Sequence, residues 1–367
     1  MSRQLLFLPG PVTVAQPVLD ATARPMIDHR GPEFAALLER VVAALRPVFG
    51  TSGEIVVLGS SGTGAMETAL VNLFSPGDRL LSCPVGAFGK RFAAIAKSFE
   101  CEVETLETPV GSAVDPRALR ARLEADRDRR VTGILLTHNE TSTGVANDMA
   151  AIAPIVREHG ALTLVDSVSG LGASEFAMDA WGYDAVASAS QKAFAAPPGI
   201  AMLALSERAM TKASQRTSGR FYFDVRTAAE FARIGQTPWT PPISILYSLD
   251  VALARYHVEG MAAAFARHAR NAETVREAFR RLGFTLVSQP GAHSDTVIAA
   301  YPPGGLQPAV LLKRLRERHG IVLAGGQGEL AGKIVRCGTM GDLTEADFLT
   351  AFEAIEATLD ELTSGVA

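Results

Sequence analysis

From about residue 54 onward, short apolar runs alternate with longer segments in which apolar residues recur at helical spacing. The pattern predicts strands at 54–58, 79–82, 102–106, 133–137, 161–165 and 185–188, and helices at 64–74, 88–98, 116–125 and 147–159. Strands that alternate with helices of about 10–15 residues are typical of βαβ units, whose parallel strands are covered by helices on both faces. The sequence therefore predicts an α/β fold built on a mostly parallel sheet.

The pattern changes after the proline-rich segment 238–242. Apolar residues then recur at helical spacing from Ile243 to about Leu282, which predicts one long helical stretch. The later runs mix strand-like and helical patterns, at 285–287, 296–300, 309–318 and 333–337. We place a boundary near residue 255, inside the long helix. Residues 1–255 then form an N-terminal arm and a large domain, and residues 256–367 form a smaller C-terminal α+β domain.

Polar residues directly follow several of the predicted strands. In open α/β sheets, ligands bind outside the carboxyl ends of the strands, so polar side chains at these positions are candidates for a binding site. The candidates lie at 59–61, at 137–139, at Asp166 and at 190–192.

Asp166 and Lys192 have the most specific chemistry among these candidates. Asp166 ends the apolar segment 162–166, and Lys192 follows the small and apolar segment 183–189. Pyridoxal-5′-phosphate (PLP) chemistry needs such a pair, because a lysine amine forms a Schiff base with the cofactor while a carboxylate keeps a proton on the pyridine nitrogen. Taken singly, each residue also fits an ordinary role, Lys192 as a solvated lysine and Asp166 as a helix cap.

The glycine-rich segment 59–64 follows a predicted strand and opens a predicted helix. Backbone N–H groups at a helix N-terminus attract anions, and the hydroxyls of Ser61 and Thr63 add donors. Tight turns need glycine in any case, so this segment alone is weak support for an anion site. Phe88 lies beyond the next strand, where an aromatic ring can cover one face of a pyridine, although phenylalanine is more often a core residue.

The segment 138–144 carries several hydroxyls and one carboxylate directly after another predicted strand. Capping of the following helix accounts for some of these residues but not for so many. A hydroxyl at this position can bond the phenolic oxygen of the cofactor. We interpret His138 as a structural histidine and not as the catalytic base.

Composition narrows the classes of function. The chain has 367 residues, 47% of them hydrophobic, which suggests about two domains with a large core. A net charge of −4 and an isoelectric point near 6.0 give no broad basic field, so neither nucleic acid nor a membrane surface is an expected partner. Cys83, Cys101 and Cys337 are too scattered for a disulfide framework or a CxxC metal site, so no metal is expected. Without a leader-like N-terminus or an apolar run of about 18 residues, a cytoplasmic protein is expected.

Five groups of motifs resemble those of the class V aminotransferases, and the likeness extends in order from Pro9 to Gly341. They are Ser-Gly-Thr-Gly at 61–64, His-Asn-Glu-Thr-Ser-Thr-Gly-Val at 138–145, Val-Asp-Ser-Val-Ser at 165–169, Ser-Gln-Lys-Ala at 190–193 with Ala-Pro-Pro-Gly at 196–199, and Gly-Lys-Ile-Val-Arg-Cys-Gly-Thr-Met-Gly at 332–341. The likeness is closest to the alanine–glyoxylate and serine–glyoxylate branch. It implies fold type I, with a seven-stranded sheet in the large domain, and a homodimer whose active sites lie at the subunit interface.

The resemblance also implies roles for individual residues. Lys192 and Asp166 are the catalytic residues that it implies, and Arg336 and Gly10 belong to the substrate site, with Arg336 as the clamp for the substrate carboxylate. The cofactor residues that it implies are Ser61, Gly62 and Thr63 in the phosphate loop, Phe88 at the stacking position, Thr141 near the phenolic oxygen, Val168, Gln191 beside the phosphate, and Thr237 and Thr240, which reach the phosphate of the neighbouring subunit.

Two positions depart from the pattern of the glyoxylate enzymes. The stacking residue is often tryptophan in those enzymes and is Phe88 here. The segment that reaches the neighbouring subunit often carries tyrosine where Thr237 stands. Both departures bear on substrate preference and not on the cofactor.

The implied reaction is ping-pong transfer of an amino group from alanine or serine to a 2-oxo acid, preferably glyoxylate. A 2-aminoethylphosphonate–pyruvate transaminase shares most of the motifs and is the main alternative. A cysteine desulfurase needs a mobile nucleophilic cysteine, whereas Cys337 adjoins Arg336 at the end of an apparent strand. A non-catalytic subunit that retains the fold is a further alternative, which visible absorbance of a lysine-bound cofactor would exclude.

Overall fold

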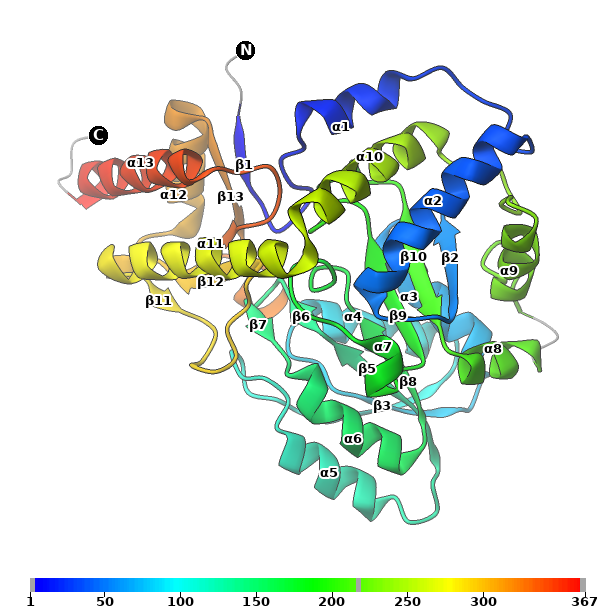
Figure 1. Ribbon diagram of the computed structural model, residues 1–367. Helices are drawn as coiled ribbons and strands as arrows, with labels where there is room; N and C mark the ends of the chain where they lie inside the picture. Colours follow the sequence, from blue (N-terminus) through cyan, green and yellow to red (C-terminus); the bar gives the residue numbers. More distant parts are fainter. Residues whose placement is uncertain (1–3, 216–218, 364–367) are drawn as a thin grey trace.

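The computed structural model describes residues 4–215 and 219–363 and is built around two main sheets (Figure 1). β10 pairs antiparallel with both of its neighbours in the larger sheet, and the other pairs of that sheet are parallel. The predicted α/β fold with a mostly parallel, seven-stranded sheet is therefore confirmed. Its strands follow the spatial order β2 (Glu54–Leu58), β10 (Ala201–Leu205), β9 (Ala185–Ala189), β8 (Leu162–Asp166), β5 (Val131–Thr137), β3 (Arg79–Ser82) and β4 (Glu102–Thr105).

Helices cover both faces of the larger sheet, because successive side chains of a buried strand point to opposite sides. Leu164 and Val165 of β8, for example, belong to two different clusters of buried side chains. The cluster of Leu164 includes side chains from α3 (Gly62–Leu73), α4 (Ala87–Ser98), α8 (Glu207–Ser214) and α9 (Val225–Arg233). The cluster of Val165 includes side chains from α1 (Gln16–Asp20), α2 (Pro32–Phe49), α5 (Pro116–Ala125), α6 (Met149–His159), α7 (Met178–Trp181) and α10 (Ile243–Glu259).

The helices around the larger sheet differ in whether the side chain of the N-cap residue bonds the first turn. α5 and α6 each begin after an aspartate whose side chain accepts a backbone N–H of the first turn, Asp115 from Arg117 and Asp148 from Ala151. α3 follows Ser61, whose side chain makes no such bond, and α4 follows Gly86. The starts of α3 and α4 therefore lack a cap from their own N-cap side chains, and both lie at the carboxyl edge of the sheet.

The smaller sheet combines the two ends of the chain, because β1 pairs in parallel with β13 (Figure 1). Its core contains Phe7 of β1 together with side chains from α11 (Met261–Arg281), α12 (Pro308–Arg314) and α13 (Glu345–Thr363). The proposed domain boundary near residue 255 falls inside α10 and stays a proposal. The strands follow the order β1 (Leu5–Phe7), β13 (Ile321–Gly325), β14 (Val335–Gly338), β12 (Val297–Tyr301) and β11 (Thr285–Leu286).

The prediction of one continuous helical stretch from Ile243 to about Leu282 is wrong at one position. The chain forms α10 and α11 as separate helices, and Gly260 lies between them with φ +88°. Glycine lacks a Cβ and adopts this backbone conformation without strain. Hydrophobic spacing continues on both sides of such a break, so periodicity alone does not reveal it.

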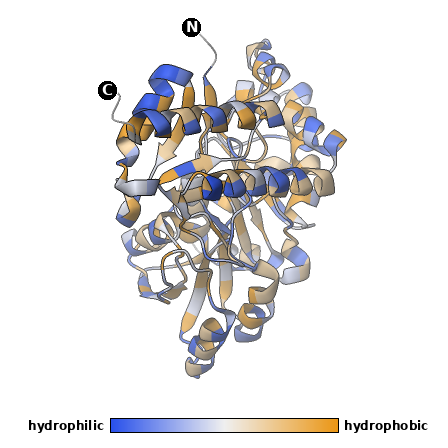
Figure 2. Ribbon diagram, turned by 90° about the vertical axis from the view of Figure 1, so that its left-hand side faces the viewer, coloured by the Kyte–Doolittle hydropathy of each residue, from blue (hydrophilic) through white to orange (hydrophobic). Residues whose placement is uncertain are grey.

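Figure 2 shows hydrophilic and hydrophobic residues interspersed along the helices, the pattern of helices with one buried and one exposed face. Among the described residues, no helix is both long enough and apolar enough to cross a bilayer.

Candidate active site

A cavity of about 330 Å³ opens at the carboxyl edge of the larger sheet. Many of the residues predicted for the site line it, namely Gly10, Ser61, Gly62, Thr63, Phe88, Thr141, Asp166, Val168, Gln191 and Lys192. Asn139, one of the strand-end candidates at 137–139, also lines it. Further lining residues were not predicted, namely Pro11, Met66, Arg91, Ser169 and Pro198. Among the described residues, the lining does not include the predicted Thr237, Thr240 or Arg336.

Asp166 is the last residue of β8 and is buried. Its Oδ1 accepts the backbone N–H of Val168 at 3.0 Å. Burial raises the pKa of Asp166 to about 6, because the charged carboxylate loses solvation, and the bond from Val168 acts in the opposite direction. A cation beside the carboxylate would favour its charged form again, so this position suits a positively charged ligand atom.

Lys192 follows the end of β9, and its Nζ donates a hydrogen bond to the carbonyl of Pro9. Burial lowers the pKa of Lys192 to about 8, and the charge of Asp166 acts in the opposite direction. A lysine with a lowered pKa carries more neutral amine near pH 7. A larger fraction of Lys192 than of an exposed lysine is therefore available as nucleophile and base near pH 7.

Gly10 allows the N-terminal segment to pass directly over Lys192. Its φ is +129°, and a Cβ at this position would lie 2.7 Å from Cδ of Lys192. The same segment crosses β14, where a Cβ on Gly338 would lie 2.0 Å from the carbonyl oxygen of Leu8. These glycines permit a close contact between Lys192 and the segment that follows β1 of the smaller sheet.

The N-terminus of α3 forms a second wall of the cavity. Ser61 is exposed, and Gly62 is buried against Val168, so closely that a Cβ on Gly62 would lie 2.5 Å from Cγ2 of Val168. Gln191 also lines the cavity, and its buried amide oxygen has no hydrogen-bond partner among the described residues. Backbone N–H groups without a side-chain cap and the hydroxyls of Ser61 and Thr63 make this wall suitable for an anion such as a phosphate.

Phe88, in the first turn of α4, presents an aromatic ring to the cavity. The guanidinium of Arg91, one turn further along the helix, lies 4.7 Å from the centroid of this ring, and its Nη1 donates to Oγ1 of Thr63 at 3.3 Å. Arg91 therefore links the α4 wall to the α3 wall. Its position one helical turn after Phe88 was the available sequence signal, because residues three apart share a helix face.

Arg336 lies in β14, behind the loop that carries Thr141. It is buried, its Nε donates to the carbonyl of Gly325 at 2.7 Å, and its Nη1 donates to the carbonyl of Thr141 at 3.0 Å. Burial lowers the pKa of Arg336, and the charge of Glu140 acts in the opposite direction. The guanidinium is thus fixed next to the cavity through a residue that lines it.

Thr237 and Thr240 lie in the segment that precedes α10. Thr237 is buried, and its hydroxyl donates to the carbonyl of Trp239 at 2.8 Å. Thr240 is exposed. Neither residue is among the described residues that line the cavity.

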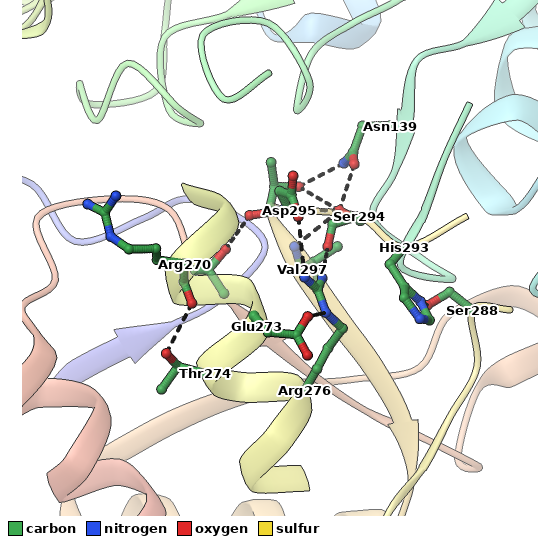
Figure 3. A network of polar contacts seen from close by, with 12 residues as sticks. Asn139, Arg270, Glu273, Thr274, Arg276, Ser288, His293, Ser294, Asp295 and Val297 are labelled. Atoms are coloured by element: carbon green, nitrogen blue, oxygen red, sulfur yellow. Dashed lines mark hydrogen bonds and ion pairs between the residues drawn. The ribbon is translucent and has the colours of Figure 1, made fainter. Parts of the chain in front are cut away.

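Asn139 is fixed by buried hydrogen bonds that connect the two sheets (Figure 3). Its Nδ2 donates to the hydroxyls of Ser169 at 2.8 Å and Thr296 at 2.7 Å, and its Oδ1 accepts from Ser294 at 2.6 Å. The carbonyl of Ser294 in turn accepts from Nη1 of Arg276 in α11 at 2.9 Å. Asn139 belongs to the motif at 138–145, but the local sequence gives no signal for partners so far along the chain.

Two residues considered in the sequence analysis are enclosed by protein. The ring nitrogens of His138 lie 2.8 Å from the hydroxyl of Ser167 and 3.2 Å from that of Ser174, and burial lowers the pKa of His138 to about 4. Cys337 is buried, and burial raises the pKa of its thiol. A buried thiol with a raised pKa does not fit the mobile nucleophile of a desulfurase. Among residues 4–215 and 219–363, no group of three or more His, Cys, Asp or Glu side chains is placed to hold a metal ion.

One cavity thus combines an amine of lowered pKa, a carboxylate that suits a cation, an anion-binding helix start and an aromatic ring. This combination can bind an anionic aromatic compound, add an amine to its carbonyl group and transfer protons within reach of Lys192.

Comparisons with known proteins agree with this chemistry. The family model "Aminotransferase class-V" matches residues 17–335. The L-aspartate–glyoxylate aminotransferase of Paracoccus denitrificans is 35% identical, over 98% of this chain and 92% of its own length. A protein named soluble hydrogenase, small subunit, from a Synechococcus species is 36% identical, over 98% of this chain and 94% of its own length.

The solved structure of an alanine–glyoxylate aminotransferase from a Nostoc species matches with a TM-score of 0.93 and 32% identity, covering 98% of this chain and 96% of that one. The resemblance inferred from the sequence motifs is therefore confirmed. The chain belongs to the class-V aminotransferase family and is an aminotransferase of fold type I.

Proposed function

We propose that this enzyme uses PLP to transfer the amino group of alanine or serine to a 2-oxo acid, preferably glyoxylate. The observation that carries the proposal is the single cavity that combines Lys192, Asp166 and the N-terminus of α3. Class V aminotransferases use PLP, and two of the proteins compared above are named as glyoxylate aminotransferases. Donor and acceptor take turns in the same cavity, so the kinetics are ping-pong.

The residues of the cavity fit the parts of PLP. Lys192 offers an amine to the cofactor's carbonyl group, and Asp166 offers a carboxylate to the pyridine nitrogen. When bound, PLP supplies an electron sink that makes the hydrogen on the α-carbon of an amino acid acidic. The further residues that we assign to it are Ser61, Gly62, Thr63 and Gln191 at the phosphate, Phe88 and Val168 at the ring, and Thr141 at the phenolic oxygen.

Lys192 and Asp166 divide the proton chemistry between them. Nζ of Lys192 takes up the proton that leaves the substrate α-carbon and later returns a proton, a task for which a pKa of about 8 is suitable near neutral pH. The carboxylate of Asp166 keeps the pyridine nitrogen protonated. Arg336 and Gly10 contribute to the substrate site, Arg336 through its guanidinium and Gly10 by letting the chain pass close to Lys192.

The test is a panel of amino donors and acceptors run as half-reactions, followed by the change in visible absorbance as the cofactor gains or loses the amino group. Alanine and serine should react fastest among the donors, and glyoxylate fastest among the acceptors. Aspartate belongs in the panel because a relative is named for it. If 2-aminoethylphosphonate reacts far faster than alanine and serine, that alternative replaces our choice of donor while transamination stands.

Arg336→Lys is expected to raise KM for alanine and for glyoxylate by about tenfold, because hydrogen bonds to charged groups contribute about 1.5–3 kcal/mol. A guanidinium offers a planar fork of N–H donors to a carboxylate, whereas lysine keeps the charge and loses the fork. The visible spectrum of the bound cofactor should change much less. Steady-state kinetics with both substrates measure this change. KM values like those of the wild type would contradict the assignment of Arg336 to the substrate carboxylate.

We further propose a homodimer in which each subunit contributes to the partner's active site. The segment with Thr237 and Thr240 adjoins an exposed aromatic group, in which the Phe221 ring is 77% exposed and lies 4.8 Å from that of Trp239. Exposed apolar patches and aromatic side chains are typical of protein interfaces. In such a dimer, the hydroxyl of Thr240 binds the phosphate of the neighbouring subunit's cofactor.

Thr240→Ala is expected to weaken PLP retention, and excess cofactor should restore the visible absorbance. In the proposed dimer, each site takes Lys192 from one subunit and Thr240 from the other. Mixing Thr240→Ala subunits with inactive Lys192→Ala subunits should therefore create some sites with both side chains intact. Activity at limiting PLP should then exceed that of either variant alone. Verified heterodimers without any recovery would argue against shared sites.

A further inference from the structure

Glu140 is a fully buried carboxylate next to the cavity, and none of the roles assigned above uses it. Its Oε2 accepts the backbone N–H groups of Phe88 at 2.9 Å and Gly89 at 3.0 Å, and its Oε1 accepts that of Ser142 at 3.0 Å. Phe88 and Gly89 belong to the first turn of α4, 52 and 51 positions away in the chain. Glu140 therefore joins two walls of the active site through one charged group.

Gly86 makes room for this carboxylate. A Cβ on Gly86 would lie 2.5 Å from Cγ of Glu140 and 2.4 Å from Oγ of Ser142. The start of α4 is consequently capped from the loop at 140–142, since the N–H of Ala87 also donates to Oγ of Ser142 at 2.8 Å. A carboxylate at this position interacts favourably with the positive end of the helix dipole. The helix that carries Phe88 thus takes its cap from the loop that carries Thr141.

The loop that carries Glu140 and Thr141 is also bonded to Arg336. Thr141 lies between Glu140 and Ser142, and its carbonyl accepts Nη1 of Arg336 at 3.0 Å. Burial lowers the pKa of Arg336 and the charge of Glu140 opposes this shift, so the two groups also interact through their charges. One carboxylate is therefore connected to Phe88 on α4 and, through the Thr141 loop, to Arg336 on β14.

We propose that Glu140 is a positioning residue, which sets the covering ring of Phe88 and the guanidinium of Arg336 at a fixed place relative to each other. This inference rests on the proposed transaminase function. Among the described residues, those that line the cavity do not include Glu140, so it acts through Phe88, Thr141 and Arg336. A helix cap with a purely structural role would change stability and leave the affinities of the folded enzyme for cofactor and substrate unchanged.

Glu140→Gln tests the proposal in the complete enzyme. Glutamine has the size of glutamate, and its amide oxygen can still accept the N–H groups of α4. Its NH₂ group then faces the N–H of Ser142, and because both groups are hydrogen-bond donors, we expect the loop to shift. We expect KM for alanine and glyoxylate, and the dissociation constant of PLP, to rise by about tenfold each, the scale of one lost hydrogen bond to a charged group. The value of kcat should fall less, and the far-ultraviolet circular dichroism of the folded protein should stay unchanged.

Gly86→Ala is the second variant, and it keeps the carboxylate but displaces it. It should raise the same constants, and it decides the matter if Glu140→Gln does not fold. Glu329→Gln is the matched control, because it makes the same chemical change at an exposed carboxylate. Glu329 pairs with Lys90 of α4, the helix that also carries Phe88. Exposed ion pairs contribute little, so this control should stay within about twofold of the wild type.

The proposal is overturned if folded Glu140→Gln and Gly86→Ala enzymes lose stability but keep wild-type values of KM and of the PLP dissociation constant. The dissociation constant of PLP is measured on apoenzyme without any amino acid. It therefore tests the contact with Phe88 even if the wild type does not use alanine, an outcome that would count against the proposed substrates alone.

Discussion

Replacing Lys192 with alanine is expected to lower turnover by about 10⁴-fold, the upper range for a single positioned proton-transfer group. The amine of Lys192 lines the cavity, and burial lowers its pKa to about 8, so the variant loses a base that is effective near neutral pH. The protein should still fold, because Lys192 lines the cavity, where its amine donates to the carbonyl of Pro9, and does not belong to the clusters of buried hydrophobic side chains. PLP should still bind without a covalent link.

Borohydride reduction followed by mass spectrometry of the intact chain measures the loss of the covalent link. The wild type should retain the mass of the reduced cofactor after denaturation, and Lys192→Ala should not. Lys97→Ala is a suitable control, because Lys97 is an exposed residue in the last turn of α4. Cofactor fixed to the Lys192→Ala chain would show that another amine makes the link.

The sequence was sufficient to predict that Asp166 and Lys192 lie close together. Each follows a short apolar run, and consecutive parallel strands place their carboxyl ends at the same edge of a sheet. The structure has this arrangement, since β8 and β9 are parallel neighbours. The loops after β2 and β5 reach the same edge for the same reason, which explains why Thr63 and Thr141 line the cavity as well. Local periodicity thus predicts which strand ends carry the site.

Contacts between distant segments lie beyond such a prediction. β1 is three residues long and pairs with β13 more than 300 positions later, so no local pattern identifies it as part of the smaller sheet. Gly86 and Glu140 are a similar case. Each fits an ordinary local role, Gly86 as a turn glycine and Glu140 as a loop carboxylate. Their relation depends on a close approach in the folded chain, where a Cβ on Gly86 would lie 2.5 Å from Cγ of Glu140.

Arg336 illustrates the same limit at a residue that we propose for the substrate site. Its motif identified it as a carboxylate clamp by resemblance, but the sequence did not indicate that two of its nitrogens bind the carbonyls of Gly325 and Thr141. A guanidinium fixed by two backbone carbonyls can turn less freely than one in solvent. The loop at 139–144 is therefore connected to the proposed substrate clamp as well as to the proposed cofactor site.

Asp166→Asn is expected to have opposite effects on the apoenzyme and on the working enzyme. Burial raises the pKa of Asp166 from 3.8 to about 6, so the folded state binds its proton more tightly than the unfolded state does. The contribution of the protonated Asp166 side chain to the free energy of unfolding is fully present below about pH 4 and is lost as the pH rises through about 6. A shift of about two pKa units corresponds to about 3 kcal/mol, so at pH 8 the Asp166→Asn apoenzyme should be more stable than the wild type by up to about that amount. Denaturant titrations of both apoenzymes should show this difference shrinking as the pH falls from 8 towards 5.

With cofactor bound, the order should reverse, because the carboxylate then faces the pyridinium nitrogen that it is proposed to keep protonated. Removing one partner of a buried ion pair costs about 3–5 kcal/mol. If that stabilisation is gained in the transition state and not already in the bound ground state, its loss lowers kcat by at least about a hundredfold. PLP should also raise the melting temperature of Asp166→Asn by less than it raises that of the wild type, because at a given concentration a ligand of lower affinity for the folded state stabilises a protein less. An Asp166→Asn enzyme that is less stable than the wild type as apoprotein at pH 8, yet keeps its turnover, would mean that the carboxylate is a structural cap and that the pyridine nitrogen has a different partner.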